Sequence, residues 1–90
     1  MNEIVKRAFA GTMESSDVYV EIEPGENGLD IELESVVFQQ FGESIRRVVL
    51  EVLKDCDVEN ARVRVADRGA LECVIRARVE TAVLRGKEEA

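Results

Sequence analysis

The stretch DVYVEIEPGENGLDIELE, residues 17–34, decides the fold because apolar and polar residues alternate strictly on both sides of a turn signal. Such alternation is typical of strands with one buried face, here formed by Val18, Val20 and Ile22 in the first half. Residues 24–28, PGENG, combine a proline with two glycines that supply the backbone angles of a turn. The pattern predicts two strands that pair as an antiparallel hairpin, with an apolar inner face and an acidic outer face.

Two amphipathic helices are expected after this hairpin. The first is predicted to begin near Ser35, a candidate N-cap, and to end in the polar stretch 55–60. Its buried stripe would comprise Val37, Phe41, Ile45, Val48, Val49, Val52, Leu53 and Cys56. A strand at 61–65 and a turn at 67–69 follow, and Asp67 is expected to cap a second helix. That helix would stop at Gly86.

The element order predicts an α+β fold in which an antiparallel sheet, the hairpin plus one or two further strands, carries two helices packed on one face. Residues 1–90 are expected to form one small domain, with 87–90 as a frayed tail. Residues 4–13 fit either a strand or a short helical turn, and Gly11 and Thr12 favour extended structure. The pattern does not give the strand order.

Composition excludes several classes of protein. The chain is 34% charged and 46% hydrophobic, which is typical of a folded soluble domain. A formal net charge of −7 and the absence of tryptophan argue against binding nucleic acid. No apolar run approaches the roughly 20 residues that span a bilayer, so no membrane partner is expected. The N-terminus lacks the apolar core of a signal peptide, which predicts a cytoplasmic protein.

The residue types also argue against an independent enzyme. The chain has no histidine, the commonest general base, and no glycine-rich phosphate loop or nucleophile elbow. Cys56 and Cys73 do not form a Cys-x-x-Cys pair, so a zinc site is not expected. Both cysteines are predicted to be buried or half-buried small apolar residues.

One short stretch, AGTMESSDV at residues 10–18, places Ser15 and Ser16 between Glu14 and Asp17. It joins two segments with extended character, and Ser, Asp and Gly favour turns. Turns lie on the surface, where another protein can reach a hydroxyl. Because no activating residue is apparent, the stretch is interpreted as a place of attachment, and simple turn chemistry is the alternative.

Charge is distributed unevenly along the chain. Between Arg7 and Arg46 there are nine acidic residues and no lysine or arginine, whereas residues 46–90 carry ten basic and nine acidic residues. The serine turn therefore lies in a negative segment that could steer a basic partner towards it. A solvated, solubilising face explains the same acids. A non-enzymatic acidic protein-interaction module, without a prosthetic group, is the alternative function.

Residues 10–18 closely resemble the amino-terminal motif of the citrate lyase acyl carrier protein family, the small gamma subunit. The resemblance continues through DIELES at 30–35, QFG at 40–42 and DRGALECVIRARV at 67–79. These ordered blocks cover nearly the whole chain, whose length also suits the family. Met13 and the pair at 56–57 are the departures noted from the family pattern.

The resemblance implies that Ser15 carries phosphoribosyl-dephospho-coenzyme A, 2'-(5''-phosphoribosyl)-3'-dephospho-CoA, through a phosphodiester, while Ser16 stays free. Its thiol holds an acetyl unit as a thioester. The alpha subunit exchanges acetyl for citryl and releases acetate, and the beta subunit cleaves the citryl thioester to oxaloacetate. The carrier itself does no chemistry, and a prosthetic-group transferase is a further implied partner. The family's fold is not that of helical phosphopantetheine carriers, since this chain lacks their Asp-Ser-Leu motif.

Other residues keep two interpretations each. Glu14 and Asp17 are expected either to be recognised by the transferase or to stabilise the turn. The turn at 67–69 either contacts a partner or the arm, or has a purely structural role. Arg76, Arg78 and Arg85 either bind phosphates of the prosthetic group or lie on a solvated helix face.

Overall fold

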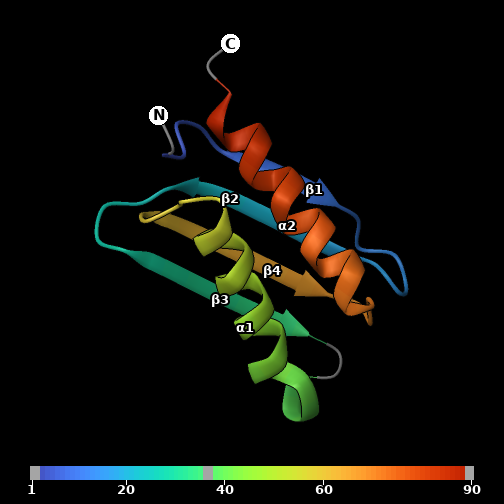
Figure 1. Cartoon of the computed structure of the whole chain (residues 1–90). Coiled ribbons are helices and arrows are strands. Elements are labelled where there is room, and N and C mark those ends of the chain that lie inside the picture. The colour runs from blue at the N-terminus through green and yellow to red at the C-terminus, as the bar shows by residue number, and fades with distance from the viewer. Residues whose placement is uncertain (1–2, 36–37, 89–90) are drawn as a thin grey trace.

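Four strands and two helices succeed one another in the computed structural model, which describes residues 3–35 and 38–88, the side chains of 38–42 excepted (Figure 1). The elements are β1 (Ala8–Gly11), β2 (Val18–Pro24), β3 (Leu29–Ser35), α1 (Phe38–Asp55), β4 (Ala61–Asp67) and α2 (Glu72–Lys87). The ambiguous stretch 4–13 thus contains a short strand. The described helices include none that is long and apolar enough to cross a membrane.

The strands form one mixed sheet in the order β1-β2-β4-β3. β1 pairs antiparallel with β2, and β2 pairs antiparallel with β4, whereas β3 runs parallel to β4. The predicted strands 17–23 and 29–34 are both present, but the predicted hairpin between them is wrong because β4 lies between them. The sheet is therefore mixed, not wholly antiparallel.

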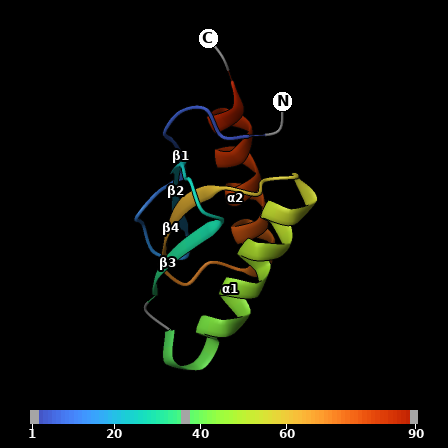
Figure 2. The same cartoon turned by 90° about the vertical axis from the view of Figure 1, so that its left-hand side faces the viewer.

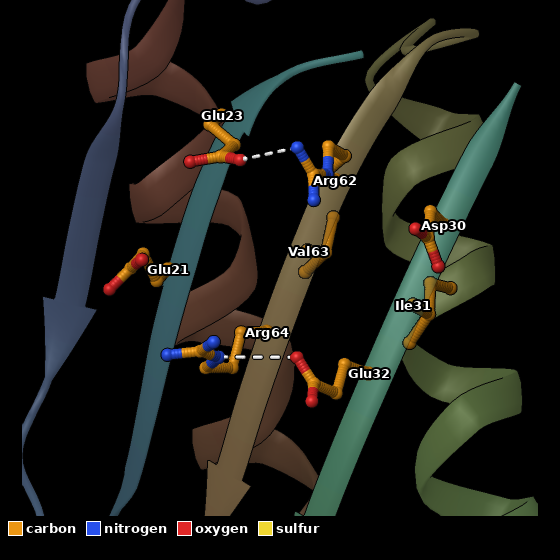
Figure 3. Close-up of a pocket in the computed structure, with 8 residues that line it drawn as sticks. All are labelled: Glu21, Glu23, Asp30, Ile31, Glu32, Arg62, Val63 and Arg64. Carbon is orange, nitrogen blue, oxygen red and sulfur yellow. Dashed lines mark hydrogen bonds and ion pairs between the residues drawn. The ribbon is translucent and has the colours of Figure 1, made fainter. Parts of the chain in front are cut away.

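Charge gives a physical reason for the insertion of β4. A hairpin of β2 with β3 would bring two acidic outer faces together, and like charges on neighbouring strands are destabilising. β4 instead places Arg62 and Arg64 between them (Figure 3). Arg62 pairs with Glu23 of β2 at 3.3 Å, and Arg64 pairs with Glu32 of β3 at 3.3 Å. The acidic first part of the chain thus meets the basic residues of the second part within the sheet.

The PGENG turn connects β2 to β3 by crossing the start of β4. The turn is held there by Asn60, whose side-chain oxygen accepts a hydrogen bond from the Gly28 amide at 2.8 Å. A Cβ on Gly25 would lie 2.9 Å from backbone atoms of Ala61. Only glycine allows this close approach, so the turn prediction is confirmed although the turn spans a strand.

Both helices cover the same face of the sheet, as the edge-on view in Figure 2 shows. The predicted α+β class with two helices on one face is therefore confirmed. The core lies between these layers and contains alternate residues of β2 and β4 with the apolar stripes of α1 and α2. Its fully buried side chains include Val18, Val20, Ile22, Val49, Leu53, Val65, Val79 and Val83.

The helix boundaries differ from those predicted. Ser35 belongs to β3, and α1 begins at Phe38, so Ser35 is not its N-cap. Val37 and the side chain of Phe41 lie outside the described residues. α2 begins after Leu71 with no side-chain cap, and it continues through Gly86 to Lys87. A Cβ on Gly86 would lie 3.2 Å from Ile4 and 3.3 Å from Ile22, so this glycine serves packing and not helix termination.

The two cysteines lie in different environments. Cys56 is half-buried after α1, as predicted, and burial raises the pKa of its thiol. Cys73 is exposed, so the prediction for it is wrong. It lies in the first turn of α2, where the buried stripe is formed by other positions such as Ile75 and Val79. Among the described residues, no group of histidine, cysteine or acidic side chains could hold a metal ion.

Candidate functional site: the loop between β1 and β2

The serine-containing stretch forms the loop between the antiparallel strands β1 and β2, beside the start of α2 (Figure 1). Gly11 ends β1 with a φ of +89°, and a Cβ there would lie 1.8 Å from the carbonyl oxygen of Val18. The loop can therefore leave the sheet at residue 11 only because that residue is glycine. The predicted position between two extended segments is confirmed.

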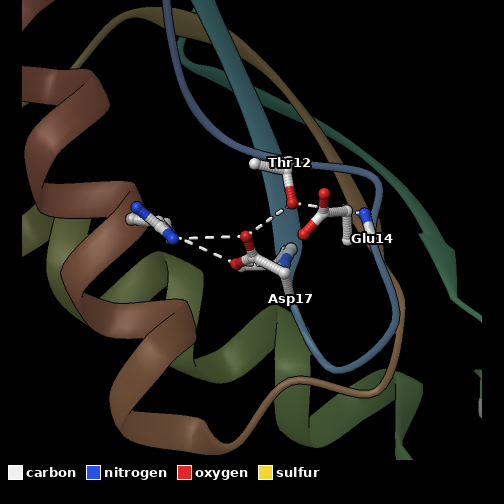
Figure 4. A network of polar contacts seen from close by, with 5 residues as sticks. Thr12, Glu14 and Asp17 are labelled. Atoms are coloured by element: carbon white, nitrogen blue, oxygen red, sulfur yellow. Dashed lines mark hydrogen bonds and ion pairs between the residues drawn. The ribbon is translucent and has the colours of Figure 1, made fainter.

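Asp17 is the centre of a polar network that fixes the loop (Figure 4). Its carboxylate accepts hydrogen bonds from the Thr12 hydroxyl at 2.7 Å and the Val18 amide at 2.7 Å. Arg78 of α2 donates to both carboxylate oxygens, at 3.2 Å each. The Thr12 hydroxyl also accepts a bond from the Glu14 amide at 3.2 Å. A single carboxylate thus ties both ends of the loop to each other and to α2.

The same contacts determine the charge state of Asp17. The hydrogen bond from Thr12, then that from the Val18 amide, then the Arg78 guanidinium hold the pKa of this carboxyl down at about 2. Asp17 is therefore ionised at neutral pH. The turn-stabilising interpretation of Asp17 is the one that this geometry supports.

Backbone bonds hold the loop against the segment between β4 and α2. The Ser16 amide donates to the Arg68 carbonyl at 2.9 Å, and the Arg68 amide donates to the Asp17 carbonyl at 2.9 Å. Ser16 has a φ of +67°, and in this conformation its amide donates to the segment between β4 and α2. These hydrogen bonds fix the loop against its neighbouring segment, so it forms a platform of defined position.

Asp67 stabilises the segment between β4 and α2 through several hydrogen bonds. It is 2% exposed and accepts hydrogen bonds from the amides of Gly69 and Ala70 and from the Ser35 hydroxyl, at 3.2, 2.9 and 2.8 Å. The prediction that Asp67 caps α2 is wrong, because these bonds close the turn before the helix begins. Asp67 therefore has a structural role in the turn at 67–69.

Ser15 lies at the tip of the platform with its side chain exposed. Its hydroxyl has no hydrogen-bond partner among the described residues, in contrast to that of Thr12 three positions earlier. Such an exposed hydroxyl can serve as the acceptor of a group delivered by another enzyme. Ser16 is also exposed, although its backbone is engaged.

The three arginines of α2 lie on a solvent-accessible helix face, as one of the two sequence-based interpretations predicts, and each also makes a contact within the chain. Arg76 pairs with Glu51 of α1 and with Glu72, Arg78 pairs with Asp17, and Arg85 donates to the Phe9 carbonyl at 2.9 Å. They tie α2 to α1, to the loop and to β1 in turn. The sequence did not reveal Thr12 and Arg78 as supports of the loop, because the local signal was limited to a Thr and an Asp flanking the serines.

Comparison with protein families identifies relatives of the whole domain. Residues 5–86 match the family model described as ACP, malonate decarboxylase delta subunit (MdcD). The chain is 57% identical to the citrate lyase acyl carrier protein of Escherichia fergusonii, over 97% of this chain and 91% of that one. It is 54% identical to the citrate lyase acyl carrier protein of Vibrio cholerae, over 92% of this chain and 86% of that one.

A solved structure has the same fold. A chain in the crystal structure of a Pseudomonas malonate decarboxylase hetero-tetramer in complex with malonate matches with a TM-score of 0.79 at 24% identity. The match covers 91% of this chain and 84% of that chain. It establishes the mixed sheet with two helices on one face as a fold that other chains adopt.

Proposed function

The chain belongs to the family of citrate lyase acyl carrier proteins, which are carrier subunits and not catalytic ones, and from this premise we propose that Ser15 is the residue that carries its prosthetic group. Membership of an acyl carrier family implies a covalently attached prosthetic group. The group proposed here is phosphoribosyl-dephospho-coenzyme A, joined to Ser15 through a phosphodiester. The whole of residues 1–90 would act as one carrier domain.

The observation that carries this proposal is the state of the Ser15 hydroxyl. It is exposed, it has no hydrogen bond to give up among the described residues, and it lies on a loop fixed by Asp17. A bulky phosphodiester there would displace no packed side chain. The residues present therefore fit the group, and Ser15 would be its only covalent anchor.

The group, when attached, supplies a thiol that holds acetyl or citryl as a thioester. The contribution of this chain is positional, because a tethered acyl unit reaches two active sites at a raised effective concentration. The Asp17 network keeps the point of attachment in one place relative to the rest of the domain. Citrate cleavage to oxaloacetate and acetate would then use catalytic residues of the partners, which agrees with the absence of histidine here.

The proposed partners follow from the same premise. They are the alpha subunit, a transferase, and the beta subunit, a lyase, of a cytoplasmic citrate lyase, together with the transferase that loads Ser15. A multisubunit assembly is also the context of the Pseudomonas structure that shares the fold. No nucleic acid or membrane partner is proposed.

Intact-mass measurement of the protein purified from its own host tests this function. The native chain is expected to carry the added mass of one phosphoribosyl-dephospho-coenzyme A unit, and Ser15→Ala is expected to lack it. Ser16→Ala is the matched control, because Ser16 is also an exposed serine in the same loop. It should keep the group, since the proposed attachment is to Ser15.

The outcomes separate the alternatives. An adduct that survives in Ser15→Ala and disappears in Ser16→Ala would move the attachment by one residue. An unmodified native chain would contradict the carrier function and would favour the acidic interaction module. The side-chain change itself should not disturb the fold, because the Ser15 hydroxyl makes no hydrogen bond with the described residues.

A further inference from the structure

The face of the sheet turned away from the helices carries charged rows that run across the strands (Figure 3). Paired positions on β2, β4 and β3 define three rows: Glu23, Arg62 and Asp30; then Glu21, Arg64 and Glu32; then Tyr19, Ala66 and Glu34. In the first two rows an arginine of β4 stands between two acidic residues. Arg62 and Arg64 each make an ion pair at 3.3 Å within their row.

The third row lacks the arginine that the other two contain. Its central residue is Ala66, which is 6% exposed and lines a groove. Tyr19, Glu34, Arg64 and, from the β1–β2 loop, Met13 line the same groove. The Glu34 side chain is exposed and has no ion pair with any described residue. The row therefore has an acid and an aromatic ring with only the small side chain of Ala66 between them.

Resting on the proposed carrier function, we propose that this groove over Ala66 receives an arginine side chain from the protein partner that docks beside Ser15. The incoming guanidinium would pair with the Glu34 carboxylate and lie against the ring of Tyr19. It would thereby complete the third row in the way that Arg62 and Arg64 complete the first two.

The chemistry of the groove favours arginine over lysine. A planar guanidinium can meet a carboxylate with two parallel hydrogen bonds and can also stack on an aromatic face. Contact of the cation with the aromatic face adds a further attraction at exposed sites. A compact ammonium group could not make both contacts from one position. The small side chain of Ala66 leaves the depth in which the aliphatic part of an arginine would lie.

The location of the groove fits docking of a carrier. Met13, which lines the groove and is 49% exposed, is two residues from Ser15 in the same fixed loop. A partner seated on the groove would hold its active site close to the root of the arm. The rows contain five acidic residues against two arginines, and this excess of negative charge would steer a basic surface towards the open face.

Titration of the carrier into the assembled alpha and beta subunits from the same host tests the inference, with calorimetry reporting the affinity. Ala66→Arg would fill the groove with the chain's own guanidinium, which can pair with Glu34 and exclude the partner. Glu34→Gln removes the charge at the groove. Loss of a charge-assisted hydrogen bond corresponds to about 10- to 100-fold weaker binding, and we expect both variants to show it. Asp30→Asn, on the same strand and face but in a row with its own arginine, should change the affinity less than about twofold.

Each outcome gives a decision. Wild-type affinity for both Ala66→Arg and Glu34→Gln would overturn the docking inference, and a normal Ser15 adduct mass would leave the carrier function standing. Equal weakening by Asp30→Asn would also overturn it, because general charge and not the groove would then govern binding. If the wild-type chain does not bind the subunits, the docking inference fails, and the Ser15 adduct mass decides the carrier function separately. Circular dichroism checks that Ala66→Arg folds, and Glu34→Gln decides the matter alone if it does not.

Discussion

Asp17 shows how one side chain can convert a turn into a platform. Its side chain is 15% exposed, and its carboxylate accepts hydrogen bonds from a hydroxyl, a backbone amide and a guanidinium. Arg78 lies 61 residues away in the sequence. The serine that would carry the arm is thus fixed through a neighbour two positions later, which leaves the Ser15 hydroxyl free for modification.

The Asp17 carboxyl is expected to titrate at about pH 2, below its ordinary value of 3.8. A carboxyl with a lowered pKa in the folded state contributes stability that is complete above its unfolded pKa and is lost as the pH falls through the folded value. The contribution of Asp17 should therefore be complete above about pH 4 and disappear towards pH 2. NMR titration of the carboxyl carbon shifts measures the Asp17 pKa directly.

Two variants rank the causes of this shift. Thr12→Val removes the hydroxyl that donates to the carboxylate, and Arg78→Met removes the guanidinium with its two hydrogen bonds and its charge, so each variant should raise the Asp17 pKa. The variant with the larger rise identifies the side chain that contributes more. A native Asp17 pKa near 3.8 would contradict the network as a whole.

The sequence predicted the serine turn but only part of its support. Ser15, Ser16 and Asp17 have the composition of an exposed turn, and that local signal needs no knowledge of the fold. The contacts of Arg78 and Arg68 with the loop depend on where α2 and β4 end in space. Such contacts leave no periodic pattern, so the sequence favoured a solvated helix face for Arg78, with phosphate binding as the alternative, and did not indicate the contact with Asp17.

The strands show the same division between local and long-range information. Alternation located β2, β3 and β4 to within about two residues, because alternation reflects which side of each strand is buried. It does not say which strands are neighbours. The PGENG turn suggested a hairpin, since turns usually join adjacent strands. The alternating arginines at 62 and 64 contained the missing information, because they complement the acids of both β2 and β3.

The β1–β2 connection depends on a glycine that no side chain can replace. Gly11→Ala should destabilise the fold by roughly 2–5 kcal/mol, from the cost of a positive φ together with the collision of its Cβ with the Val18 carbonyl. Gly28→Ala is the matched control, because Gly28 has a φ of +88° but nothing within 4 Å of an added Cβ. It should cost only about 1–2 kcal/mol. Urea denaturation measures the change in the free energy of unfolding for both variants. Equal losses would show that the backbone shifts to relieve the contact between the Cβ at residue 11 and the Val18 carbonyl at no cost.

Taken together, the domain has one closed face and one open face. Helices α1 and α2 bury one side of the sheet, and they leave the opposite side uncovered (Figure 2). A carrier has to offer its point of attachment to more than one partner. A fold that places its whole core on one side of the sheet would leave the other side for the proposed partners, and this is the face that contains the groove over Ala66.

The stability of this small domain should depend on the layer between sheet and helices. A chain of 90 residues has a free energy of unfolding of roughly 5–13 kcal/mol. Leu53 of α1 is 0% exposed, and Leu53→Ala should cost about 2–5 kcal/mol, a large share of that total. Leu84 of α2 is 57% exposed, so Leu84→Ala should stay within about 0.5 kcal/mol of wild type.

Denaturant unfolding, followed by circular dichroism, compares the free energies of unfolding of Leu53→Ala and Leu84→Ala. Intact mass then measures the fraction of each variant that carries the proposed Ser15 adduct. Because loading requires the folded loop, Leu53→Ala should reach a lower fraction of Ser15 adduct in its host than Leu84→Ala, although neither residue is near Ser15 in the sequence. Equal stability of the two variants would contradict the one-sided core. A stable Leu84→Ala chain that nevertheless fails to be loaded would instead show that the outer face of α2 takes part in recognition, and the docking surface would then extend beyond the open face of the sheet.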